Sequence, residues 1–115
     1  MPTYLYRIVA AADVESCKAG TYTGAKLDWD DKFIHLSTKE QVAGTLERFF
    51  ADQTVEIVKL RSKEMEAAAL RFDFVEKLGS FFPHYYRTVL PTTGDVLAGS
   101  CTASDGKLVD EAFLE

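Results

Sequence analysis

Short hydrophobic segments alternate with polar turns along the whole chain, and their spacing predicts a mixture of strands and short helices. Segments rich in aromatic and β-branched residues predict strands over residues 4–9, 32–36, 54–60, 69–74 and 86–90, with a further strand or irregular edge over 95–101. Helical spacing and helix-forming residues predict short helices over residues 11–19, 39–51 and 62–68. Residues 22–31 and 75–80 are predicted to be loops, and residues 108–114 fit either a short helix or a closing strand.

The clearest helical signal begins after Ser37 and Thr38, either of which can cap a helix. Glu40 or Gln41, three residues further on, would complete a capping box. Apolar residues then recur at helical spacing, as Val42, Leu46, Phe49 and Phe50.

The order of these elements lacks the regular strand–helix–strand alternation of a parallel sheet. It indicates an α+β fold with a twisted, mostly antiparallel sheet and a few short helices. The 115 residues fit a single small domain, residues 1–115. Hydrophobic residues make up 47% of the chain, which is enough for one core.

The charge balance and the apolar runs exclude several classes of protein. A net charge of −5 argues against a protein that binds duplex nucleic acid, because such proteins need a basic face. No apolar run approaches the roughly 18 residues that span a bilayer, and Met1–Tyr4 lack the features of a secretory signal. We therefore expect a cytoplasmic protein without membrane contact. Cys17 and Cys101 are expected to be two reduced thiols, with a disulfide as the alternative.

His35 lies in one of two motifs that carry the only histidines of the chain, the segment Asp31–Thr38. Strand alternation places Phe33, His35 and Ser37 on one face, where a ring, an imidazole and a hydroxyl could line a pocket. The alternative is a half-buried histidine satisfied by a backbone carbonyl, with Ser37 serving only as a helix cap.

His84 lies in the second motif, Phe81–Tyr86. Pro83 restricts its own backbone and that of Phe82, which predicts a stiff loop that presents His84 between aromatic rings. Such a loop would suit stacking against a flat ligand ring. The alternative is that Phe81 and Phe82 simply fill a hole in the core.

Arg7 lies among apolar residues of the first predicted strand, so it needs an anion or a carboxylate if it is buried. Asp73 is the candidate carboxylate, either to balance Arg7 or to orient a hydroxyl. Motifs for phosphate binding and for a serine nucleophile are absent from the sequence. Two histidines and two isolated cysteines are too few for a zinc site, so we expect no metal.

These motifs resemble the domain of unknown function 952 family, over about residues 4–97. The resemblance is carried by four segments: Tyr6-x-Ile8, Asp31-x-Phe33-Ile34-His35-Leu36-Ser37-Thr38 with Gln41, Leu70–Asp73, and Phe82-Pro83-His84-x-Tyr86. The family usually has Trp-Glu in place of Phe72-Asp73, and often has a glycine where this chain has Arg87.

The chain resembles ADP-ribosyltransferase-like folds more weakly, including RNA 2′-phosphotransferases of the KptA type. That resemblance implies a split-sheet fold with a nucleotide-sized cleft and makes NAD the candidate cofactor. Arg7 would contact the pyrophosphate or nicotinamide end, and Ser37 the nicotinamide ribose. His35 and His84 would act as donors or as general acid–base groups. Asp73, with Glu76 as an alternative, would stabilise positive charge on the ribose.

The candidate site therefore joins residues from distant parts of the chain. We assign His35, His84 and Asp73 to catalysis, and Arg7, Ser37, Thr38 and Tyr86 to ligand binding. Three functions remain open: an enzyme acting on NAD or a related nucleotide or phosphorylated metabolite, a non-catalytic module for a small molecule, and a protein-interaction domain that uses the aromatic segment 81–86. The expected oligomeric state is a monomer or a weak dimer.

Overall fold

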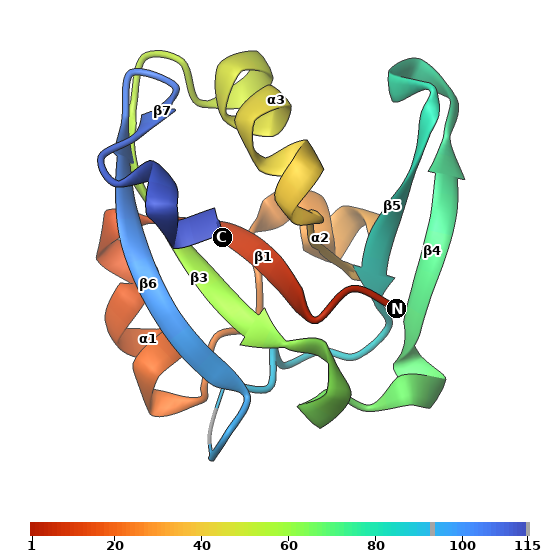
Figure 1. The fold of residues 1–115 in the computed structure, drawn as a ribbon. Helices are drawn as coiled ribbons and strands as arrows, with labels where there is room; N and C mark the ends of the chain where they lie inside the picture. Colours follow the sequence, from red (N-terminus) through yellow and green to blue (C-terminus); the bar gives the residue numbers. More distant parts are fainter. Residues whose placement is uncertain (93, 115) are drawn as a thin grey trace.

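The computed structural model describes residues 1–92 and 94–114, and its strands form two antiparallel sheets. The first sheet has the order β1-β3-β6-β7 and comprises β1 (Tyr4–Ala10), β3 (Thr54–Arg61), β6 (Leu97–Ser104) and β7 (Lys107–Leu108). The second has the order β2-β5-β4 and comprises β2 (Ile34–His35), β5 (Ser80–Tyr85) and β4 (Leu70–Val75). Figure 1 shows the two sheets on opposite sides of the molecule.

An isolated bridge joins the two sheets where the chain leaves β2. The N–H of Tyr6 in β1 donates to the carbonyl of Ser37, and the N–H of Ser37 donates to the carbonyl of Tyr6, both at 2.8 Å. The predicted α+β class with antiparallel pairing is thus confirmed.

The helices are short and connect strands along the chain. They are α1 (Val14–Ala19), α2 (Lys26–Asp31) and α3 (Lys39–Phe49), with 3₁₀ turns η1 (Ala11–Asp13), η2 (Ser62–Glu64), η3 (Ala67–Ala69), η4 (Glu76–Leu78) and η5 (Glu111–Leu114). The predicted cap of α3 is confirmed, because the N–H of Thr38 donates to the side chain of Gln41 at 3.0 Å. The chain leaves α1 through Gly20, whose φ of +75° suits glycine.

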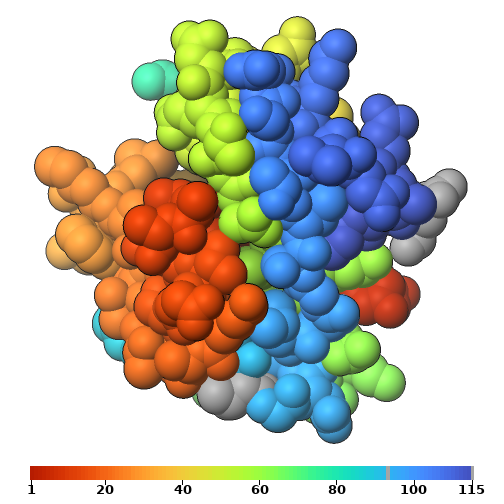
Figure 2. Space-filling model, turned by 90° about the vertical axis from the view of Figure 1, so that its left-hand side faces the viewer, coloured from red at the N-terminus to blue at the C-terminus, as the bar shows by residue number. Residues whose placement is uncertain are grey.

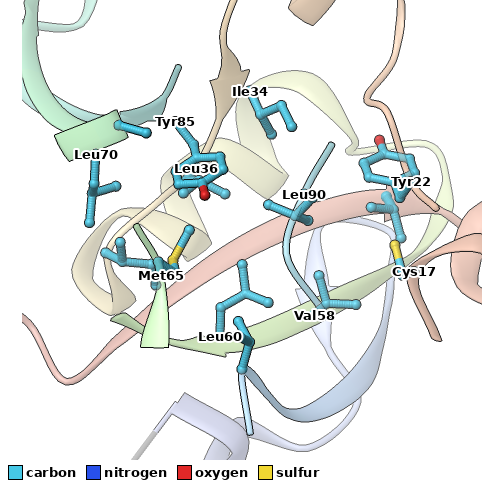
Figure 3. Close-up of a cluster of buried hydrophobic side chains, with 14 residues drawn as sticks. Cys17, Tyr22, Ile34, Leu36, Val58, Leu60, Met65, Leu70, Tyr85 and Leu90 are labelled. Atoms are coloured by element: carbon cyan, nitrogen blue, oxygen red, sulfur yellow. The ribbon is translucent and has the colours of Figure 1, made fainter. Parts of the chain in front are cut away.

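The first sheet is covered on both faces, which explains why β1 is almost continuously apolar. Leu5 and Val9 point into a core formed with the second sheet and α1. Figure 3 shows Val58 and Leu60 of β3 in this core, turned toward Leu90 from the segment after β5. Figure 2 views the molecule from the side of α1, whose red-orange segment lies beside the blue strand β6.

The second core lies on the other face of the same sheet. Tyr6 and Ile8 of β1 pack there against Val42 and Leu46 of α3, and η5 adds apolar contacts. Because side chains of a strand alternate between faces, Arg7 shares the face of Leu5 and Val9. The fold therefore places one arginine on an apolar face, between two buried aliphatic side chains.

The prediction of a loop over residues 22–31 was wrong for its second half, which forms α2. The carboxylate of Asp28 accepts the N–H of Ala25 at 2.7 Å and thereby satisfies one of the free donors at the start of this helix. Lys26 and Asp30 form an exposed ion pair one turn apart. The aspartates that suggested a loop thus stabilise a helix of only six residues.

The predictions of a stiff loop over 81–86 and of a strand over 86–90 were both wrong. Residues 80–85 form β5, the central strand of the second sheet, and the chain after Tyr85 is irregular. Proline normally avoids central strands because it lacks an N–H. The N–H and C=O of one strand residue point to the same side, and the carbonyl of Pro83 accepts from Leu36 at 3.0 Å. The side of Pro83 that lacks an N–H therefore faces the end of β2, where no ladder hydrogen bond is needed.

Smaller differences concern element boundaries. Residues 62–68 contain two 3₁₀ turns and not one helix, and residues 75–80 include η4 and the start of β5. The strand predicted over 95–101 is β6, and residues 108–114 contain both the end of β7 and η5. Within residues 1–92 and 94–114, the structure contains no helix that is both long and apolar enough to cross a membrane.

The two cysteines are free thiols and should differ sharply in reactivity. Cys17 is fully buried, and burial raises the pKa of its thiol to about 11, whereas Cys101 is partly exposed. Because the thiolate is the reactive form, we expect one thiol of the native protein to react rapidly with Ellman's reagent at pH 8. The second should react only after denaturation, and Cys101→Ser should remove the fast reaction. Equal rates for both thiols would contradict this prediction.

Candidate functional site

A cleft of about 780 Å³ lies between α3 and the β4–β5 hairpin. Figure 1 shows α3 and the β4–β5 hairpin facing each other, with α2 behind them. The lining includes most of the residues that the sequence assigned to a site: Arg7, His35, Ser37, Asp73, His84 and Tyr86. Thr38 is the exception, since it caps α3 and does not line the cleft.

Arg7 forms the buried wall of this site through a bidentate pair with Asp28. Its Nη1 donates to Asp28 Oδ1 at 2.8 Å and its Nη2 to Asp28 Oδ2 at 2.6 Å. Nη1 also donates to the carbonyl of His35, and Nη2 donates to the hydroxyl of Tyr22. The partner of Arg7 is therefore Asp28, and the suggestion that Asp73 balances Arg7 was wrong.

The carboxyl group of Asp28 is only 3% exposed, yet it is held ionised. Burial alone would raise its pKa, but hydrogen bonds from His35 and Arg7, with the charge of Arg7, lower that pKa well below its usual range. Burial likewise opposes the charge of Arg7, and the hydrogen bond to Asp28 outweighs it and raises the pKa of the guanidinium. The two charges depend on each other.

His35 is fixed between two carboxylates. Its backbone N–H donates to Asp28 Oδ1 at 2.8 Å, and its ring Nδ1 lies 2.7 Å from the same oxygen. Its Nε2 lies 2.9 Å from Asp31 Oδ2. The ring of His35 is therefore oriented at both nitrogens.

His84 lies directly opposite His35 in the pairing of β2 and β5, and the two rings are 5.5 Å apart. Phe33 stacks on His84 at 3.9 Å between ring centroids. In β5 the alternation places Phe82, His84 and Tyr86 along the cleft, while Pro83 and Tyr85 are buried.

Asp73 orients His84 from the neighbouring strand β4. Its Oδ2 lies 2.8 Å from Nδ1 of His84 and also accepts the hydroxyl of Tyr86. The hydrogen bond from Tyr86, together with that from His84, lowers the pKa of Asp73. Burial lowers the pKa of His84, and the hydrogen bond to Asp73 only partly opposes this effect. His84 is thus a largely buried, neutral imidazole at pH 7 with one nitrogen held by a carboxylate.

Nε2 of His84 has no hydrogen-bond partner in the part of the chain that the structure describes. The hydroxyl of Ser37 likewise has none, although the backbone of Ser37 joins the two sheets. Among residues 1–92 and 94–114, no three histidine, cysteine or acidic side chains are arranged to hold a metal ion. The unpartnered groups are therefore those that a ligand in the cleft would meet.

Sequence reasoning missed Asp28, which organises both Arg7 and His35. A usable signal was present, because a buried arginine requires a carboxylate, and Asp28 stands three residues after Ala25 at a helix start. Arg7 is far from Tyr22 and Asp28 along the chain, so the sequence alone does not show that it contacts them.

The lowered pKa of His84 should make the protein less stable in weak acid. The unfolded chain takes up a proton near pH 6.5, before the folded protein does, so stability is lost as the pH falls below about 6.5. For one group the slope cannot exceed about 1.4 kcal/mol per pH unit. Urea unfolding between pH 7.5 and 5 should show this slope in the wild type and a flatter one in His84→Gln. An equal slope in both proteins would contradict the assignment.

Comparison with known proteins identifies a family. The family model described as "Protein of unknown function (DUF952)" matches residues 8–97, so the chain belongs to this family. Protein CC0527 from Caulobacter crescentus has a similar crystal structure, with 27% identity, a TM-score of 0.79, and coverage of 97% of this chain and 98% of that chain. Its solution NMR structure is similar over 92% and 90% of the two chains, with 26% identity and a TM-score of 0.73. No curated protein matches the sequence.

Proposed function

We propose that this DUF952 protein binds a small molecule with a flat ring in the cleft and uses His84 as a general base. The observation that carries the proposal is the pair of His84 and Asp73, in which Nδ1 contacts the carboxylate while Nε2 is unpartnered among the described residues. With the proton on Nδ1, the lone pair of Nε2 is free to accept a proton from a bound ligand.

Asp73 and the surroundings of His84 support this role. When Nε2 takes the proton, the charge of the imidazolium is stabilised by the Asp73 carboxylate, which keeps the ring in one orientation. The lowered pKa of His84 keeps the base in its neutral form at pH 7. Phe33 and Tyr86 line the cleft beside the imidazole and offer aromatic faces to a ring.

His35 has a different part in this proposal. Both of its ring nitrogens contact carboxylates of α2, so it positions the strand and the ring of Phe33 and does not take the proton. Ser37 offers its hydroxyl on the floor of the cleft.

The resemblance to ADP-ribosyltransferase-like folds makes NAD the first nucleotide to test. The aromatic walls favour the ring-binding part of that expectation. The phosphate-binding part has less support, because Arg7, its expected ligand, is already paired with Asp28.

The test compares wild type with His84→Gln and His35→Gln on a panel of NAD, ADP-ribose, nucleosides and aromatic metabolites. Thermal shift reports binding and mass spectrometry reports conversion. His84→Gln should retain binding and lose about 10²–10⁴-fold in turnover, and activity should fall in acid as His84 becomes protonated. His35→Gln should act mainly on stability. Turnover that survives in His84→Gln would exclude His84 as the base, and binding without conversion in the wild type would favour a non-catalytic module.

An exposed aromatic pair favours protein interaction as a second candidate. Phe74 and Phe81 face each other across β4 and β5 with ring centroids 5.2 Å apart, and they are 53% and 59% exposed. A second copy docking on this pair would give a weak dimer, one of the two oligomeric states, monomer or weak dimer, that the sequence left open. Sedimentation should then show a concentration-dependent dimer that Phe81→Ser abolishes, and a monomer at all concentrations would exclude it.

A further inference from the structure

The mouth of the cleft is unusually apolar for a water-exposed surface. Leu27, Phe49 and Phe74 line it although they are 60%, 56% and 53% exposed. Leu78 and Phe82 add to the same lining. Large apolar side chains that gather around one cleft mark a surface that a partner of low polarity covers.

The end of the cleft around His84, called the inner end here, is polar, and its unpartnered atoms are three acceptors and the hydroxyl of Ser37. Oδ2 of Asp73 is occupied by His84 and Tyr86, and Oδ2 of Asp31 by His35, which leaves Oδ1 of each carboxylate without a partner in the described chain. Nε2 of His84 is a third acceptor when its proton is on Nδ1. These groups form a row, carboxylate–imidazole–imidazole–carboxylate, that crosses from α2 through β2 and β5 to β4.

The cations of the lining do not compensate these acceptors. The guanidinium of Arg7 is held by Asp28, Tyr22 and the carbonyl of His35. Lys77 lies in η4, at the turn of the β4–β5 hairpin and away from the row. A phosphate or a carboxylate at the inner end would therefore meet mainly acceptors, with the neutral hydroxyl of Ser37 as a donor among the described residues.

We propose that the cleft takes a primary amine carried on an apolar body, with the ammonium at the inner end and the body against the mouth. This inference rests on the proposed small-molecule function of the same site and specifies its ligand class. An ammonium supplies donors and a positive charge, which suit an end of the cleft that offers free carboxylate oxygens and an imidazole nitrogen. His84 is at least nine-tenths buried, and its Nε2 has no partner among the described residues. This nitrogen would accept a proton from the ammonium and leave a neutral, nucleophilic amine.

The test uses three compounds that share one body: 3-phenylpropylamine, 3-phenyl-1-propanol and 3-phenylpropanoate. Titration of the protein followed by NMR gives both the dissociation constant and the place of binding. We expect the amine to bind at least tenfold more tightly than the alcohol, and the carboxylate to bind most weakly. Resonances of Phe82, His84 and Tyr86 should shift.

Two pairs of variants test separately how the ammonium group and the apolar body of the ligand contribute to binding. Asp31→Asn should weaken the amine several-fold and leave the alcohol unchanged, whereas Asp30→Asn, an exposed neighbour paired with Lys26, should change neither. Phe49→Ala should weaken the binding of all three compounds, because Phe49 lines the cleft. Phe81→Ala should weaken the binding of none, because Phe81 does not line it.

The outcomes distinguish this inference from the proposed function. Equal binding of amine and alcohol, or tighter binding of the carboxylate at the same resonances, overturns the amine inference while the cleft remains a ligand site. Failure of all three compounds to bind also overturns it. If the metabolite panel and the three compounds all leave the His84 resonances unchanged, both proposals fail.

Discussion

Asp28→Asn should be among the most destabilising single changes in this protein. The substitution keeps the size of the side chain but removes the charge that faces the buried guanidinium of Arg7, and its amide would direct donors toward donors. Breaking one partner of a buried ion pair costs about 3–5 kcal/mol, a large part of the roughly 5–15 kcal/mol that stabilises a domain of ordinary size. Urea unfolding at pH 7, followed by circular dichroism, measures the loss.

The matched control is Asp30→Asn, two residues further along the same helix. Asp30 pairs with Lys26 on the exposed surface, where such pairs contribute about 0–1 kcal/mol. We therefore expect a change below about 0.5 kcal/mol. A loss of similar size in both variants would mean that α2 responds to charge in general and that the buried pair has no special weight.

The pH dependence of the loss provides a second check. Because the pKa of Asp28 lies below its unfolded value, its stabilising effect is present above about pH 4 and disappears as the pH falls toward the folded pKa. The difference between wild type and Asp28→Asn should therefore shrink below about pH 4. Combining Arg7→Met with Asp28→Asn should recover part of the loss, since the uncompensated buried charge is then gone.

The position of His35 in the cleft lining could be predicted because local rules govern it. Alternation along residues 33–37 correctly placed Phe33, His35 and Ser37 toward one surface, and all three line the cleft. The capping signal around Thr38 correctly placed the start of α3. Both inferences use only neighbours along the chain, where side-chain direction follows from backbone geometry.

Pairing between distant segments could not be foreseen in the same way. His35 lies opposite His84 only because β2 and β5 pair in one register, and a shift of one residue would turn His84 away from the cleft. Pro83 led to the prediction of a loop where β5 forms. A proline fits this central strand only because β2 ends beside it, which the local sequence does not reveal. The carboxylate of Arg7 was misassigned for the same reason, since α2 and β1 meet only in the folded chain.

The cleft thus combines two kinds of constraint. Both Nη atoms of Arg7 and both oxygens of Asp28 are hydrogen-bonded, and only the buried Nε of Arg7 lacks a partner among the described residues. The pair therefore holds β1, β2 and α2 together and leaves little capacity for a ligand. His84 and Asp73, by contrast, leave unpartnered atoms among the described residues. A site in which one ion pair gives rigidity and a separate imidazole stays available suits binding or proton transfer more than it suits packing.

Gly24→Ala should also destabilise the protein strongly, through Asp28. Gly24 has φ +94°, and a Cβ there would lie 2.9 Å from Cβ and 3.0 Å from Oδ2 of Asp28. Backbone strain of about 1–2 kcal/mol and displacement of a packed side chain of about 1–3 kcal/mol should together cost about 2–5 kcal/mol. Thermal and urea unfolding of the variant measure this sum.

Two other glycines separate the strain from the clash. Gly79 has φ +65°, and a methyl group added there would have nothing within 4 Å, so Gly79→Ala should show only the backbone cost of about 1–2 kcal/mol. Gly44 lies in α3, and a methyl group there would also have nothing within 4 Å. Gly44→Ala should therefore raise the free energy of unfolding by about 0.5–1 kcal/mol. If Gly24→Ala acts by displacing Asp28, its cost should be smaller in the Asp28→Asn background, where the ion pair is already weakened. Full additivity of the two changes would show that Gly24 matters for its backbone alone.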